Sequence, residues 1–103
     1  MPNRDTIQKI RADVRRRHAH NILVLFRVGD SLEAYFDDAT VIHKILPGLP
    51  LENRPQGREL PLPTVCFPAD RQEEYSSRLL EAGYPVHVYQ ARDENGNYKI
   101  EPL

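Results

Sequence analysis

The sequence of 103 residues contains a single cysteine, Cys66. It therefore lacks an internal disulfide and a cysteine partner for a zinc site. The apolar surroundings PTVCFP favour a small buried hydrophobe over a reactive thiol. No apolar run approaches the roughly 18 residues that a membrane span needs. The N-terminus, MPNRDTIQKIR, has no apolar signal-peptide core. We therefore expect a cytoplasmic protein with no membrane partner.

The sequence also lacks a strong excess of charge of one sign. The net charge of −1 does not predict a nucleic-acid binder by bulk electrostatics. Residues 1–27, however, hold seven of the 14 lysines and arginines against two aspartates, so a phosphate-attracting face would come from there. The run RRR at 15–17 can equally be the solvated end of a helix, where cations are favourable. No GxxxxGK[ST] phosphate loop is present, so we expect no ATP site and no cofactor.

The length is that of one domain, and 40% hydrophobic with 28% charged residues is ordinary for a globular protein. We find no internal repeat and no linker, so residues 1–103 are expected to form a single domain. Its first element is an amphipathic helix that is capped by Asp5 or Thr6 and ends near residues 17–19. This helix is predicted by the apolar stripe Ile7, Ile10 and Val14.

A β-hairpin is predicted next. The run ILVLFRV at 22–28 is apolar and β-branched, and it is too short for a typical helix. Gly29-Asp30 is a turn dipeptide, and apolar residues alternate with others over residues 31–36. Asp37 or Asp38 should then cap a helix that Pro47-Gly48 ends.

The second half begins with a proline-rich stretch at 47–63, which predicts a loop with at most short edge strands. A short strand at 64–67 follows, then a helix capped by Asp70 and ended by Gly83. Strands are expected at 84–90 and 98–100, joined through a hairpin at Asn95-Gly96. The fold class is therefore α/β (α+β), a mixed sheet flanked by about three helices.

Two segments resemble the N-terminal domain of the MutS mismatch-repair family. LVLFRVGDSLEAYFDDA at 23–39 is similar to that domain's strand, Gly-Asp turn, Phe-Tyr-Glu strand and Asp-Asp-Ala helix start. PTVCFPADRQEEYSSRLLEAGYPVHVYQ at 63–90 is similar to its strand, proline turn, helix, glycine exit and final strand. The likeness extends over roughly residues 7–90. It implies the mismatch-recognition domain, in which the Phe stacks on a mispaired base and the Glu hydrogen-bonds it.

This chain departs from the family motif at the stacking position. Ser31 stands where the Phe belongs, and Glu33 stands at the Glu position. Serine cannot stack, and a stacked aromatic contributes about 1–3 kcal/mol per base. Strand alternation points Leu32 to the opposite face. Tyr35 shares the face of Ser31 and Glu33, so it is the aromatic that could take over a base contact.

We therefore expect a non-catalytic module that binds double-stranded DNA with weakened or lost mismatch specificity. Further candidate DNA-binding residues are the arginines Arg15, Arg16, Arg54 and Arg58. The alternative is a protein-interaction or structural module that kept the fold without DNA binding, with a protein partner at a surface such as residues 47–63.

Two other constellations favour ordinary structural roles. Asp30, Glu33, Asp37 and Asp38 could suggest a metal-dependent nuclease, but turn and helix-cap chemistry accounts for them. Histidines at 18 and 20 are a poor zinc pair without further ligands. We therefore expect neither a metal site nor a catalytic site.

Overall fold

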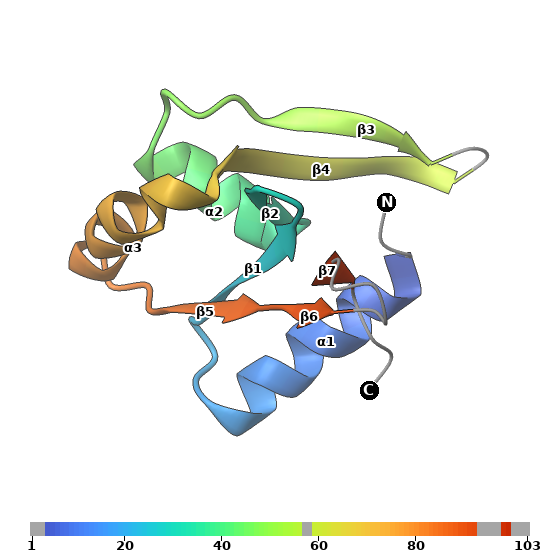
Figure 1. The fold of residues 1–103 in the computed structure, drawn as a ribbon, viewed down its shortest axis with the longest axis horizontal. Coiled ribbons are helices and arrows are strands. Elements are labelled where there is room, and N and C mark those ends of the chain that lie inside the picture. The colour runs from blue at the N-terminus through green and yellow to red at the C-terminus, as the bar shows by residue number, and fades with distance from the viewer. Residues whose placement is uncertain (1–3, 57–58, 93–97, 100–103) are drawn as a thin grey trace.

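A mixed five-stranded sheet lies between one helix on one face and two on the other (Figure 1). The computed structural model describes residues 4–56, 59–92 and 98–99. The helices are α1 (Arg4–Arg17), α2 (Asp37–Ile45) and α3 (Gln72–Glu81), and α3 is preceded by the 3₁₀ turn η1 (Ala69–Arg71). The sheet order is β3-β4-β2-β1-β5, formed by β1 (Leu23–Val28), β2 (Ser31–Tyr35), β3 (Glu52–Gln56), β4 (Glu59–Pro68) and β5 (Val86–Tyr89). The predicted fold class is confirmed.

Strand alternation divides the core into two apolar clusters, one on each face of the sheet. Leu23 and Leu25 of β1 pack with α2 and α3, whereas Val24 and Phe26 pack with α1. β1 can supply both clusters because it is buried on both faces, as its continuous apolar sequence predicts. No helix in the described part of the chain is long and apolar enough to cross a membrane.

The predicted hairpin at Gly29-Asp30 is confirmed. β1 pairs antiparallel with β2 in a register that sets Val28 opposite Ser31. Gly29 has a φ of +61°, a left-handed conformation that suits glycine. Gly83, with a φ of +96°, ends α3 as predicted. β5 then runs parallel to β1 at the edge of the sheet.

The proline-rich stretch departs most from its prediction. Instead of a loop it contains β3 and the first part of the ten-residue strand β4. β4 pairs with β3 over residues 59–64 and with β2 over residues 64–68. Most residues of β4 therefore have a partner strand on one side only. A proline, which has no N–H to donate, is tolerated where its nitrogen points to the side without a partner strand. The prediction allowed a short edge strand, which β3 is, but it was wrong for the first part of β4, which is a long strand inside the sheet.

The predicted helix caps are also wrong, beginning with α1, which already includes Asp5 and Thr6. The N-cap of α2 is Phe36, with no side-chain cap, so neither Asp37 nor Asp38 caps the helix. Asp70 lies within η1, and the N-cap of α3 is Arg71. The carboxylate of Asp38 has tertiary partners instead, which are described below.

The C-terminal hairpin is described only in part. β6 (Ala91–Arg92) pairs antiparallel with β7 (Tyr98–Lys99). The predicted turn at Asn95-Gly96 lies outside the described residues. The pairing of the two flanking strands is the arrangement that a hairpin there would give.

Candidate nucleic-acid interface

The three motif residues of β2 lie on the α1 face of the sheet. Ser31 begins the strand and is half-buried, whereas Glu33 is 8% exposed and Tyr35 has no exposed surface. Leu32 points to the opposite face and is fully buried in the cluster of α2 and α3, as predicted. The open end of this face is therefore at Ser31, and the strand becomes more deeply buried towards Tyr35.

The carboxylate of Glu33 is held by partners within the chain. Its Oε1 accepts a hydrogen bond from Nη1 of Arg54 at 2.7 Å and another from the Tyr35 hydroxyl at 2.7 Å. Arg54 comes from β3, two strands away from β2 in the sheet, and its Nε also lies 3.6 Å from Glu52. The structure thus joins Glu33, Tyr35 and Arg54, three of the predicted site residues, into one cluster.

The charges in this cluster are balanced. Burial and then the Glu33 carboxylate raise the pKa of Tyr35, so its hydroxyl stays protonated and donates. Burial lowers the pKa of Arg54, but Glu33 outweighs this and the net pKa is raised. Cys66 lies opposite Glu33 in the β2–β4 register, half-buried, and burial followed by Glu33 raises the pKa of its thiol. Cys66 is therefore a neutral thiol at physiological pH, as its apolar surroundings suggest.

Tyr35 offers no surface to a base in this structure. Its ring has no exposed area and lies 5.3 Å from the Phe26 ring, centroid to centroid. Strand alternation gave the correct face for this side chain. It did not show that the ring lies under α1, so the expected base contact would need a rearrangement of the core.

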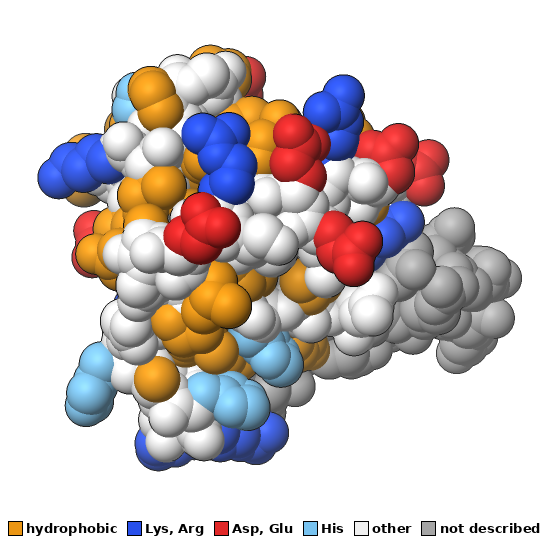
Figure 2. All heavy atoms as spheres, turned by 90° about the vertical axis from the view of Figure 1, so that its left-hand side faces the viewer, with side chains coloured by type: hydrophobic (Ala, Val, Ile, Leu, Met, Phe, Trp, Pro, Cys, Tyr) orange, Lys and Arg blue, Asp and Glu red, His pale blue; other side chains and the backbone are white. Residues whose placement is uncertain are grey.

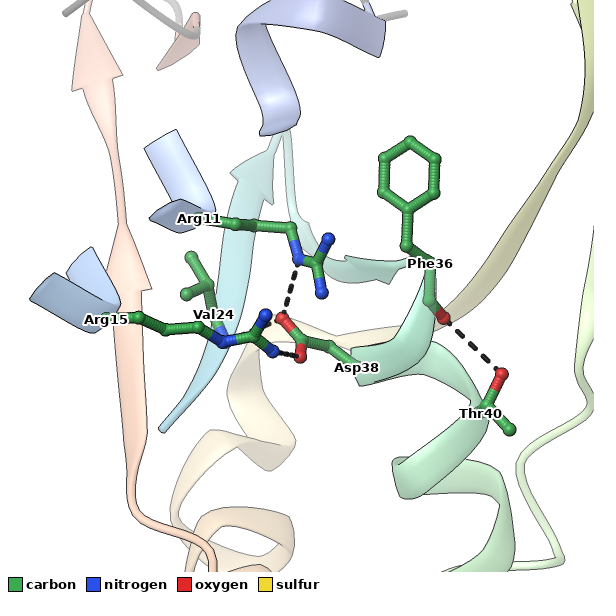
Figure 3. A network of polar contacts seen from close by, with 6 residues as sticks. All are labelled: Arg11, Arg15, Val24, Phe36, Asp38 and Thr40. Carbon is green, nitrogen blue, oxygen red and sulfur yellow. Dashed lines mark hydrogen bonds and ion pairs between the residues drawn. The ribbon is translucent and has the colours of Figure 1, made fainter. Parts of the chain in front are cut away.

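The predicted phosphate contact Arg15 belongs to a buried ionic cluster (Figure 3). Asp38, with no exposed surface, accepts hydrogen bonds from Arg15 and from Nε of Arg11, the latter at 3.0 Å. The backbone N–H of Val24 in β1 also donates to Asp38, at 3.3 Å. The Asp38 carboxylate thus ties α1, α2 and β1 together.

Phe36 completes this junction between α1 and α2. It has a φ of +59°, which is a strained conformation for a bulky residue and which ends β2 abruptly. The guanidinium groups of Arg4 and Arg11 each lie 5.3 Å from the centre of its ring. A cation over the face of an aromatic ring is attracted to it electrostatically, so the Phe36 ring helps to hold these two arginines in the junction.

The remaining predicted arginine with described surroundings, Arg16, is not part of these clusters. Arg16 and Arg17 both bind the carboxylate of Asp13, with side chains 75% and 67% exposed. One carboxylate between two guanidinium groups leaves a net positive charge at this end of α1. Neither Arg15 nor Arg16 contacts the Glu33 cluster, and Arg58 lies outside the described residues.

Sequence reasoning missed the roles of Asp38 and Arg11. Arg11 and Arg15 are four residues apart beside the apolar stripe of α1, which places both guanidinium groups on the buried side of the helix. That spacing indicates an ionic contact on the buried side of α1. Only one of Asp37 and Asp38 could cap a helix, so the other was free to be the partner.

The acidic and histidine constellations form no metal site in the part of the chain that is described. No group of three or more His, Cys, Asp or Glu side chains there could hold a metal ion. Glu33 and Asp38 are bound to different arginines, and Asp30 lies in the exposed hairpin turn. His18 and His87 do meet, with ring centroids 5.2 Å apart.

The fold and this face define an α+β module whose motif residues lie on the second strand of a Gly-Asp hairpin. The family MutS domain I matches residues 12–101. The DNA mismatch repair protein MutS of Chlorobium phaeobacteroides is 40% identical over 76 residues, which are 74% of this chain and 8% of that protein. The MutS of Synechococcus elongatus is 35% identical over 78 residues, 75% of this chain and 9% of that protein. The MutS of Dehalococcoides mccartyi is 29% identical over 99 residues, 96% of this chain and 11% of that protein.

This chain belongs to the MutS domain I family. It spans about a tenth of the length of the curated relatives it matches.

Proposed function

We propose that this chain is a non-catalytic module that binds duplex DNA and has lost most of the preference for mismatches. Its membership of MutS domain I supports a DNA-related role, since the relatives are DNA mismatch repair proteins. The observation that carries the proposal is the state of the two motif positions. Ser31 supplies no ring at the open end of β2, and the Glu33 carboxylate is already bound to Arg54 and Tyr35.

The Glu33–Arg54 pair changes what the motif carboxylate can do. An unpaired carboxylate on a DNA-facing surface would repel phosphates. Pairing with Arg54 at 2.7 Å removes most of that repulsion, so the face tolerates a duplex. The same pairing engages Oε1 of the carboxylate and holds the side chain against Arg54 and Tyr35, and this weakens recognition of any displaced base.

Non-specific attraction to the duplex would come from exposed cations. Arg16 is the most exposed of the candidate arginines whose surroundings are described, and it shares the carboxylate of Asp13 with its exposed neighbour Arg17. Arg11 and Arg15 are committed to Asp38 and would contribute little to phosphate binding without breaking that cluster. Binding should therefore be weak, with a small number of phosphate contacts.

The test is a titration of labelled duplex DNA at about 50 mM and about 200 mM salt. We expect measurable binding at the lower salt and a lower affinity at the higher one, because each arginine–phosphate contact releases a counterion from the DNA. Arg16→Gln should reduce the salt slope by up to about one unit. Arg71→Gln removes another exposed cation, from the 3₁₀ turn before α3, and serves as the matched control, with no change expected. Absence of binding at the lower salt would reject the proposal.

One observation favours the alternative, a protein-interaction module that kept the fold. Arg15 and Arg54, two of the predicted DNA contacts, are already neutralised within the chain. If the duplex titration fails while the folded protein is intact, this second function is the one to pursue.

A further inference from the structure

The two edges of the sheet differ in how they are protected. Unpaired strand edges invite pairing with another chain, and proteins block them with charges, prolines and bulges. The β3 edge has all three: Glu52 and Arg54, Pro55, and a shift of register between Arg54 and Gln56. The β5 edge has the sequence VHVY and none of these devices.

The backbone of β5 leaves hydrogen-bonding groups open on that edge. The N–H of Leu23 donates to the carbonyl of Pro85 at 2.8 Å, and Leu23 is in register with Val86. In a parallel pair, alternate residues direct both their N–H and C=O groups to the partner strand. The backbone N–H and C=O groups of residues 85, 87 and 89 therefore point to β1. The corresponding groups of Val86 and Val88 point away from every other described strand.

A groove runs along this edge between β5 and α3. Its volume is about 460 Å³, and its lining includes the side of α3 that carries Leu80. Leu80 is 61% exposed, one of two large hydrophobic side chains so exposed among the described residues. Figure 2, which looks onto the side of the molecule with α3, shows apolar side chains gathered between acidic side chains above and histidines below. The full lining is Gln72, Glu73, Ser76, Ser77, Leu80, Pro85, Val86, His87 and Val88.

The charge of the lining favours a cation. Glu73 is exposed, and no salt bridge joins it to another described residue. His87 is the lining residue that could carry positive charge, but burial and then His18 lower its pKa, which keeps it neutral at pH 7. The groove therefore combines open backbone groups, apolar side walls and one uncompensated carboxylate.

We propose that the β5–α3 groove binds an extended peptide segment, which pairs with β5 as an added strand. The segment would have alternating apolar side chains, which fit the walls, and a lysine or arginine that meets Glu73. Main-chain hydrogen bonds provide affinity in this mode, and alternate side chains provide specificity. A second copy of this chain fits less well, because it would bring a second Glu73 and no lysine or arginine in its own groove lining.

The probe is the acetylated and amidated hexapeptide Lys-Val-Thr-Val-Thr-Lys, titrated to about 1 mM and followed by amide NMR shifts. We expect saturable shifts centred on Val86 and Val88. The same peptide with N-methylated valines cannot form the ladder, and a version with Glu in place of Lys reverses the charge. Both should bind at least about tenfold more weakly, because each loses one of the two recognition terms.

Substitutions in the protein locate the site. Val88→Pro removes an outward N–H and leaves the bonds to β1 in place, so it should also weaken binding at least about tenfold. If Val88→Pro perturbs the fold, Leu80→Ser and Glu73→Lys test the same site from the surface of α3. Leu60→Ser removes the other exposed leucine, 78% exposed on β4, and should leave binding unchanged.

Each other outcome overturns the proposal. No saturable shift at Val86 and Val88 from the probe would exclude strand addition at this edge. Equal binding by the N-methylated peptide would exclude the ladder. Dimerisation that Val88→Pro abolishes, without peptide binding, would replace the peptide by a second copy of the chain.

Discussion

Two carboxylates in this molecule bind arginines, and their surroundings differ. Asp38 has no exposed surface and accepts from two arginines of α1 and from the backbone of β1. Glu33 is 8% exposed and accepts from one arginine of β3 and from Tyr35. Asp38 lies at the junction of two helices and a strand, whereas Glu33 lies on the face that carries the family motif.

The difference separates the structural role of Asp38 from the binding role that we propose for the face of Glu33. Removing one partner of a buried pair leaves a charge without compensation, so the Asp38 cluster must stay intact for α1 to pack. Arg54 comes from the strand at the edge of the sheet, and its side chain is 23% exposed. The Glu33–Arg54 contact can therefore be altered with less effect on the fold, which suits the binding role that we propose for this face.

The largest effect is expected for Asp38→Asn. It leaves the buried Arg11 and the partly buried Arg15 without their counter-charge, and we expect a loss of about 3–5 kcal/mol in the free energy of unfolding. Urea unfolding measures this, with the exposed neighbour Asp37→Asn as control. If the two variants unfold at the same urea concentration, the structural role of Asp38 is refuted.

A double-mutant cycle of Glu33→Gln and Arg54→Gln should give a smaller value. The pair is close but partly solvated, so we expect a coupling energy of about 1 kcal/mol. The cycle of Glu74→Gln and Arg71→Gln on the exposed surface of α3 should give less. Coupling in the Glu33 cycle as large as the Asp38 effect would remove the distinction between the two carboxylates.

Tyr35→Phe removes a single hydrogen bond to Glu33 and keeps the buried ring. We expect a loss of about 0.5–1.5 kcal/mol in thermal or urea unfolding. Tyr75→Phe, whose ring contacts Phe67 with centroids 4.8 Å apart, is a suitable comparison. A stabilising effect of Tyr35→Phe would mean that Arg54 alone satisfies Glu33.

The smallest effect concerns pH. The pKa of His87 is lowered from 6.5 by burial and by His18, so the unfolded chain binds the proton more readily than the folded one. The contribution of His87 to the free energy of unfolding should therefore be fully present above about pH 6.5 and be lost as the pH falls below that value. His18→Asn should make this fall shallower, and His20→Asn should not. A stability that rises on acidification through this range would contradict the assignment.

Local patterns predicted most of the fold correctly. The stripe of α1, the run of β1, the Gly29 turn and the Gly83 helix end are set by neighbouring residues, so the sequence alone suffices for them. The strand β4 could not be predicted, because its prolines are tolerated only through partners on one side at a time. That pairing depends on residues far away in the chain.

The sequence predicted correctly which face of the sheet carries the candidate site, and it predicted less well which side chains contact one another there. Alternation placed Ser31, Glu33 and Tyr35 together, which the structure confirms. It could not show that Arg54 reaches Glu33 from β3, or that α1 covers Tyr35. Asp38 was assigned to a helix start because aspartate commonly caps helices, and two arginines more than twenty residues earlier decided otherwise.

The central claim is that position 31 lacks the ring that recognises a mismatch. The direct measurement is the ratio of dissociation constants for a homoduplex and a G·T heteroduplex, for the unchanged chain and for Ser31→Phe. We predict a ratio within about twofold of one for the unchanged chain, and at least about fivefold in favour of the heteroduplex for Ser31→Phe. A preference of about tenfold for the heteroduplex by the unchanged chain would contradict the account.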